Sequence, residues 1–143
     1  MSSSPSLVVA PRAREARRAL LLAGIGAWAA IVPYLGKALG LVVNVPDRVE
    51  VVDHVVPGAV IVAAALYLHR LARRRPVAGH GPGLLAAGAS FLAGFWILAT
   101  HVPLLGDAAR DAVSWEAAIW HSIAALPIVV LACWFVLRAI PDD

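Results

Sequence analysis

Two side chains that can do chemistry stand next to each other in the stretch EVVDHVVPG, residues 50–58. Asp53 offers a carboxylate and His54 an imidazole, at the beginning of a long apolar run. Two further histidines, His101 and His121, stand near the ends of other apolar runs. Imidazole binds transition metals and haem iron and also carries protons near neutral pH. These residues therefore point to ligand binding or to proton transfer.

The composition is that of a membrane protein. Of 143 residues, 61% are hydrophobic and only 15% are charged, and the mean hydropathy is +0.80. Soluble domains are about 45–50% apolar. A single cysteine, Cys133, excludes an intrachain disulfide and any CxxC redox or zinc motif. Phosphate-binding loops and the HExxH, G-x-S-x-G and CxxCH motifs are absent from the sequence, so the common soluble enzyme classes are excluded, and whether the chain is an enzyme stays open.

Four apolar runs are each close to the roughly 20 residues that an α-helix needs to cross the hydrocarbon core of a bilayer. They cover about residues 18–42, 52–70, 83–105 and 115–138. We predict an all-α membrane protein in which these four transmembrane helices form an up-down bundle, a single domain over residues 18–143. The arginine-containing residues 1–17 are predicted to form a flexible basic tail.

The basic residues are distributed unequally between the two sides of the bundle. Nine of the twelve lie in the N-terminal tail, the middle loop and the end of the last helix: Arg12, Arg14, Arg17, Arg18, Arg70, Arg73, Arg74, Arg75 and Arg138. The positive-inside rule therefore predicts that both termini are cytoplasmic, in a multi-pass protein of the bacterial inner membrane. The arginine cluster attracts anionic lipid of the bilayer, and it requires no nucleic-acid partner.

The chain contains an internal repeat. In each half, a P-x-L-G element is followed by a polar loop and then by a helix with a histidine near its beginning, and these histidines, His54 and His121, are 67 positions apart. Each half, about residues 18–73 and about residues 82–140, is expected to be a helical hairpin. Because two crossings return the chain to its starting side, the repeats are expected to be parallel, related by a pseudo-twofold axis along the membrane normal.

The repeat resembles the SPW-repeat family of small bacterial membrane proteins, in which a tryptophan and a proline precede a two-helix unit. The resemblance rests on Trp28 with VPYLG at residues 32–36 and on Trp96 with VPLLG at residues 102–106. It covers the chain from about residue 24 to about residue 138. The resemblance implies a four-helix membrane unit, and it transfers no site residues.

Three histidines are expected to lie at one depth in the membrane. His54 and His121 are 16 and 17 residues from the arginines that end their helices, about 25 Å of α-helix. His101 is 18 residues from Gly83 on a helix of opposite direction, about 27 Å. Because polar side chains at this depth avoid lipid, we predict that the three rings face a common interior pocket near the non-cytoplasmic surface. The other two histidines are expected to be solvated residues of the cytoplasmic loop: His69 and His80.

Two kinds of cofactor fit this layer. If the second and fourth helices lie diagonally across the bundle, His54 and His121 can be the two axial ligands of one haem b. A transition-metal ion is the alternative, with His101 as third ligand and Asp53 or Glu116 as a carboxylate partner. Either cofactor predicts a role in electron transfer or metal handling.

Two functions without a bound cofactor stay open from the sequence. The chain is also consistent with an accessory or structural subunit of a larger membrane complex or a homo-oligomer, in which the histidines only bond across helices. It is also consistent with a small transporter or proton path. Pro57 and Pro127 are expected to bend their helices near the histidines and to free the carbonyls of Asp53 and Ile123, which can then orient an imidazole.

Overall fold

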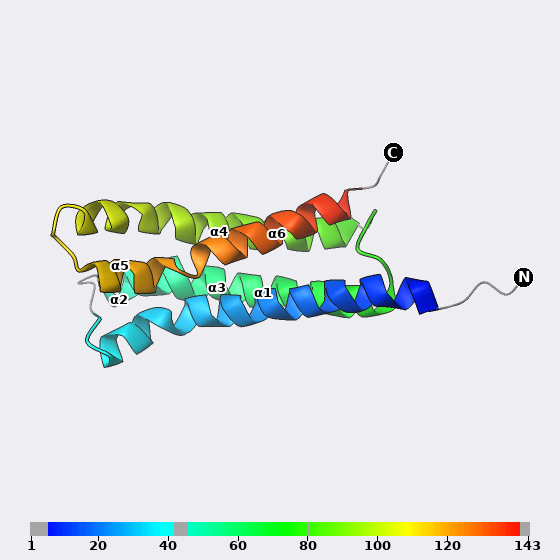
Figure 1. Ribbon diagram of the computed structural model, residues 1–143, viewed down its shortest axis with the longest axis horizontal. Coiled ribbons are helices and arrows are strands. Elements are labelled where there is room, and N and C mark those ends of the chain that lie inside the picture. The colour runs from blue at the N-terminus through cyan, green and yellow to red at the C-terminus, as the bar shows by residue number, and fades with distance from the viewer. Residues whose placement is uncertain (1–5, 42–45, 80, 141–143) are drawn as a thin grey trace, which may run out of the picture.

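A computed structural model of the chain describes residues 6–41, 46–79 and 81–140. These residues form helices and no strand. The elements in chain order are α1 (Ser6–Ala38), α2 (Asp47–Glu50), the π-helical segment η1 (Val51–Val55), α3 (Val56–Arg74), α4 (Gly81–Ala108), α5 (Trp115–Ser122) and α6 (Ala125–Ala139). Figure 1 shows them as one elongated bundle, in which α1 begins and α6 ends at the same end.

Four spans of this bundle are long and apolar enough to cross a membrane: Arg12–Ala38, Asp47–Arg74, Gly81–Ala108 and Trp115–Ala139. The second span runs through α2, η1 and α3, and the fourth through α5 and α6. The predicted all-α fold with four transmembrane helices is therefore confirmed in its coarse form.

The first helix has different ends from those predicted. It begins at Ser6, so residues 6–17 of the predicted tail are helical. This segment contains three alanines and three arginines, residue types that favour helix even where the chain is charged. The helix ends at Ala38 because Gly40 adopts a positive φ of 76°. The amide of Leu41 then donates to the carbonyl of Gly36 at 2.8 Å, which closes the helix with a Schellman-type turn.

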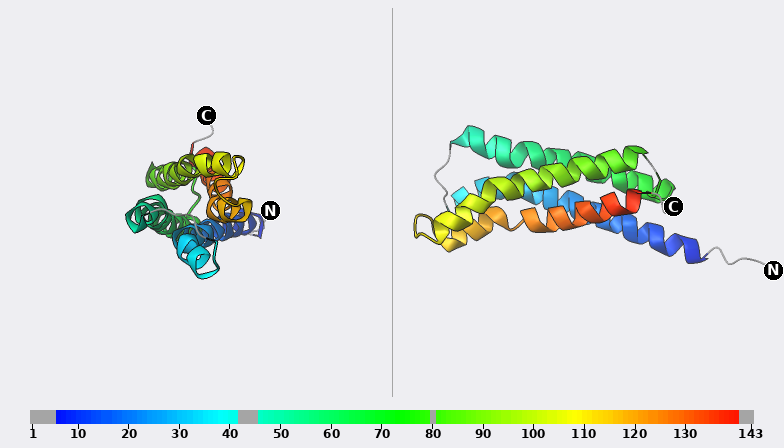
Figure 2. Two further views of the ribbon diagram at one scale, coloured as in Figure 1. Left: turned by 90° about the vertical axis from the view of Figure 1, so that its left-hand side faces the viewer. Right: turned by 90° about the horizontal axis from the view of Figure 1, so that it is seen from above.

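The four spans form a ring in which each packs mainly against its two neighbours. Viewed along the bundle in Figure 2, α3 and α4 lie side by side, and α1 and α6 complete the ring. The closest packing is within the hairpins, α1 against α3 and α4 against α6. The spans of α3 and α6 are therefore diagonal to each other.

A glycine and an isoleucine make the same close contact in both hairpins. A Cβ added to Gly26 of α1 would lie 2.6 Å from Cγ2 of Ile61 on α3. A Cβ added to Gly94 of α4 would lie 2.5 Å from Cγ2 of Ile128 on α6. Real Cβ atoms do not approach other carbons so closely, so only glycine lets the helices pack at these distances.

The two helix irregularities precede prolines. The π-helical segment η1 ends two residues before Pro57, and α5 is separated from α6 by residues 123 and 124, shortly before Pro127. A proline has no N–H to donate to the carbonyl four residues earlier, which here belongs to Asp53 or Ile123. The expected disturbance of both helices near the histidines is therefore confirmed, and Figure 1 shows the break between α5 and α6.

Candidate functional site

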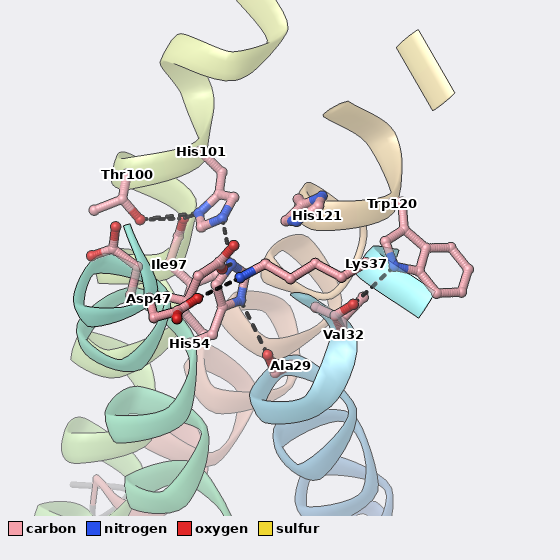
Figure 3. Close-up of polar contacts among 12 residues, drawn as sticks. Ala29, Val32, Lys37, Asp47, His54, Ile97, Thr100, His101, Trp120 and His121 are labelled. Carbon is pink, nitrogen blue, oxygen red and sulfur yellow. Dashed lines mark hydrogen bonds and ion pairs between the residues drawn. The ribbon is translucent and has the colours of Figure 1, made fainter. Parts of the chain in front are cut away.

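Three histidines from three helices meet inside the bundle, near the end opposite to the start of α1. Their exposed fractions are 2% for His54, 4% for His101 and 3% for His121. All three line one cavity of about 170 Å³, whose other walls are Val49, Glu50, Asp53, Thr100 and Leu104. Figure 3 shows the three rings facing this common space. The prediction of a shared interior pocket is confirmed.

The direct partner of His54 is His101. Their Nε2 atoms are 2.8 Å apart and their ring centroids 4.5 Å apart. The ring of His121 is farther away, with its centroid 5.9 Å from that of His54. The sequence favoured His54 and His121 as the facing pair because they are repeat-related. In the ring of helices, however, His54 and His101 lie on adjacent spans, whereas His54 and His121 lie on diagonal ones.

A backbone carbonyl orients each ring through its Nδ1 atom. Nδ1 of His54 lies 3.1 Å from the carbonyl oxygen of Ala29 on α1. Nδ1 of His101 and Nδ1 of His121 lie 2.7 Å and 2.9 Å from carbonyl oxygens one turn earlier in their own helices, those of Ile97 and Ala117. The carbonyls freed by the prolines do not serve this purpose.

These contacts favour one tautomer of each ring. A carbonyl oxygen only accepts hydrogen bonds, so each Nδ1 atom is assigned the ring proton and donates it. The Nε2 atom of each neutral ring is then left with a lone pair. Histidines that bind metals are held in the same way, with one ring nitrogen donating to a carbonyl and the other available to the ion.

The contact between His54 and His101 brings together two ring nitrogens that both lack a proton in these tautomers. Two neutral imidazoles have two ring protons, and both are used by the carbonyls, so Nε2 faces Nε2 with two lone pairs. A third proton or another cation resolves this conflict. Thr100 offers a neutral solution, because its Oγ1 lies 3.0 Å from Nδ1 of His101. If that hydroxyl donates to Nδ1, His101 can donate from Nε2 to His54, but the bond to the Ile97 carbonyl is then lost.

Glu50 is a second acid at this site beside Asp53, and it was not among the residues predicted for the site. Its side chain is 2% exposed, with Oε2 3.8 Å from Nε2 of His54, and Oε1 has no hydrogen-bond partner among the described residues. The second helix was predicted to begin at about residue 52, which left Glu50 in a loop. Because the helix begins at Asp47, Glu50 and His54 are four residues apart on one helix face. The E-x-x-x-H spacing was the available signal.

The two predicted carboxylates stand in different places. Asp53 lines the cavity, where its Oδ1 accepts a hydrogen bond from Nε1 of Trp96 at 3.2 Å. Glu116 is exposed in the first turn of α5 and does not line the cavity, so its assignment to the site was wrong. It precedes His121 by five residues, which places the two side chains about 140° apart around a helix.

His69 is not the solvated loop residue that was expected. It lies on α3, and its Nδ1 is 3.0 Å from the carbonyl oxygen of Ala16 on α1. The helix extends to Arg74, so His69 lies more than one turn before its end and packs against α1 instead of belonging to the loop. His80 lies outside the described residues.

Two measures bear on which cofactor fits the site. The cavity of about 170 Å³ is smaller than the roughly 300 Å³ at which pockets for drug-sized ligands begin, and haem exceeds most such ligands. This volume argues against the haem prediction. Within the described residues, no three His, Cys, Asp or Glu side chains already have the arrangement of a metal's ligands. Two nitrogens on one tetrahedral ion are about 3.3 Å apart, against 2.8 Å between the Nε2 atoms here.

The chain matches no protein-family model, no curated protein and no solved structure. The resemblance to the SPW-repeat family stays a prediction. The chemistry of the site therefore rests on its own donor atoms, which are three imidazole nitrogens with lone pairs and the carboxylates of Glu50 and Asp53. They come from the α2–α3 span, α4 and α5. This is a set of nitrogen and oxygen donors that small cations accept.

Proposed function

We propose that this chain is a small multi-pass membrane protein that binds one transition-metal ion through His54, His101 and His121, with the carboxylate of Glu50 as fourth ligand or counter-charge. The observation that carries this proposal is the common orientation of the rings. Each Nδ1 is committed to a backbone carbonyl, and three Nε2 atoms are left beside one buried cavity.

Binding requires a small adjustment of the two nearest rings. Their Nε2 atoms must separate from 2.8 Å to about 3.3 Å, and the ion then lies between the two lone pairs. The ring of His121 must approach from its place across the bundle. The negative charge of Glu50 offsets part of the ion's charge within the apolar bundle. Imidazole ligands suit zinc, copper, iron and nickel, and a carboxylate does not exclude any of them.

The bound ion would serve metal handling or, if it is redox-active, electron transfer. We infer from the arginine distribution that both termini are cytoplasmic and that the histidines lie near the non-cytoplasmic surface of the inner membrane. We also infer that the hairpins are parallel repeats. Gly26 contacts Ile61, and Gly94 contacts Ile128 in the same way. The two glycines are 68 positions apart and the two isoleucines 67, which supports this inference.

Metal loading of the purified protein tests the proposal. The detergent-solubilised chain is titrated with Co²⁺ while its visible absorption is recorded, and Zn²⁺, Cu²⁺ and Ni²⁺ are then quantified by elemental analysis after desalting. We expect one ion per chain. Loss of a residue that merely orients a ligand costs roughly 10- to 100-fold in affinity. We therefore expect His54→Ala and His101→Ala to weaken binding at least this much.

His69→Ala is the matched control, because it removes a partly buried histidine that bonds to a carbonyl far from the cavity. It is expected to leave the affinity within twofold of the parent value. Thermal unfolding and helix content are measured for all three variants, so that misfolding is recognised. A chain that retains none of these ions, or variants that bind as tightly as the parent, would refute the proposal. The first of these results would favour the accessory-subunit or proton-path predictions.

A further inference from the structure

A second and larger cavity lies between α1 and α3, at the end of the bundle opposite to the histidine cluster. Its volume is about 450 Å³, and its walls are Arg12, Ala13, Ala16, His69, Ala72 and Arg73. Three of these six residues are alanines, whose small side chains leave the space open. The volume falls within the range of about 300–1,000 Å³ that is usual for pockets that bind small molecules.

One hydrogen bond holds together the two helices that carry the arginines of this cavity. Nδ1 of His69 lies 3.0 Å from the carbonyl oxygen of Ala16, and this bond joins α3 to α1. Arg12 is one helical turn from Ala16, and Arg73 is one turn from His69, so both arginines stand on the faces that this bond brings together. The two guanidinium groups thus belong to different helices and border one cavity.

No carboxylate of the described residues forms an ion pair with the arginines of this cavity. Nε of Arg12 is buried and has no hydrogen-bond partner among the described residues. The ion pairs within the described part of the chain involve neither Arg12 nor Arg73. A buried donor without an acceptor costs about 1–3 kcal/mol, and more where the group is charged. An acceptor with negative charge in the cavity would remove this cost.

We propose that this cavity binds a phosphate group, held between the guanidinium groups of Arg12 and Arg73. Guanidinium presents parallel N–H donors that match two phosphate oxygens, and two such groups from separate helices can hold one phosphate from opposite sides. The candidate spans Arg12–Ala38 and Asp47–Arg74 each have one terminus at this end of the bundle, so in a bilayer the cavity would lie at the level of the phospholipid headgroups. The phosphate has two sources, the headgroup of an anionic phospholipid or a free phosphate ion. The remaining space beside the alanines favours the larger headgroup.

Lipid binding by matched double variants tests the proposal. Native mass spectrometry of the detergent-solubilised full chain measures the binding of dioleoylphosphatidylglycerol. Arg12→Gln/Arg73→Gln removes two charges at the cavity, whereas Arg74→Gln/Arg75→Gln removes two charges at the same end of α3 but outside the cavity. We expect the cavity double variant to bind the first lipid at least tenfold more weakly than the control double variant.

A third variant and a second ligand sharpen the test. Ala13→Leu, at an exposed position of α1, fills the cavity without removing charge and is expected to weaken lipid binding as well. Inorganic phosphate at millimolar concentration is then added to compete with the lipid. Competition in the parent protein that is absent from the cavity double variant would identify the free phosphate ion as the source. Equal lipid binding by the two double variants, with no effect of Ala13→Leu and no competition by phosphate, would overturn the proposal. Thermal unfolding of each variant confirms that the bundle is intact.

Discussion

The three histidines differ in what holds them. Ala29 and Ile97 are 68 positions apart, the offset that also relates Gly26 to Gly94, and their carbonyls both accept an imidazole proton. His54 bonds to the carbonyl of Ala29, and the repeat relates His54 to His121 and Ala29 to Ile97. The repeat alone would therefore predict a bond from His121 to the carbonyl of Ile97. His101 already occupies that carbonyl, and His121 bonds to Ala117 in its own helix. The third imidazole of the cluster therefore breaks the symmetry of the pair.

Replacement of Glu50 separates the roles of charge and structure at the site. We expect Glu50→Gln to weaken metal binding by roughly 10- to 100-fold, the usual cost of losing a group that supports a metal centre. The metal-free protein should be as stable as the parent or more stable, because a buried carboxylate with an unpartnered oxygen is costly and the amide is neutral. Cobalt titration and thermal unfolding measure the two effects.

The control for this substitution is Glu116→Gln, which changes an exposed carboxylate in the first turn of α5. Neither metal affinity nor thermal stability should change with it. If Glu50→Gln bound metal as tightly as the parent, the carboxylate would have no part in the site. If it unfolded the metal-free protein, Glu50 would be a structural residue.

At the scale of the helices, hydropathy predicted the spans and left their ends uncertain. The four spans follow from uninterrupted apolar runs, since no other structure satisfies the backbone in lipid. The ends depend on local chemistry. Gly40 stops α1, and the second helix begins directly after Pro46, with acidic side chains in its first turn that stabilise the start of a helix. The missed start of that helix is the reason why Glu50 was not assigned to the site.

The packing of α4 on α6 is sensitive to a single methyl group. We expect Gly94→Ala to lower stability by about 1–3 kcal/mol, because its Cβ would overlap Ile128 and force the helices apart. Gly88→Ala lies in the same helix, and its Cβ would meet nothing within 4 Å. That control should be neutral or slightly stabilising, since alanine favours helix over glycine. Thermal unfolding in detergent compares the two, and an equal effect of both would exclude the close contact.

At the scale of the whole molecule, the two ends of the bundle carry different chemistry. The buried histidines and Glu50 lie at one end, and the arginine-lined cavity lies at the other (Figure 1). Counting residues along straight helices was enough to predict that three histidines share one layer. It did not predict which two would pair, because that depends on the order of the helices around the ring, which the sequence does not specify.

The orientation of the bundle in the membrane decides which compartment supplies the ion. Cysteine labelling of two variants in a Cys133→Ala background tests this orientation. Ala78→Cys lies in the connection between α3 and α4, and Ala112→Cys lies in the connection between α4 and α5. Both positions are exposed. A maleimide that does not cross membranes should label the second variant in intact cells and the first only after lysis, because the loop that follows four arginines stays in the cytoplasm. The reverse pattern would place the histidine cluster at the cytoplasmic surface, where the ion would come from the cell interior.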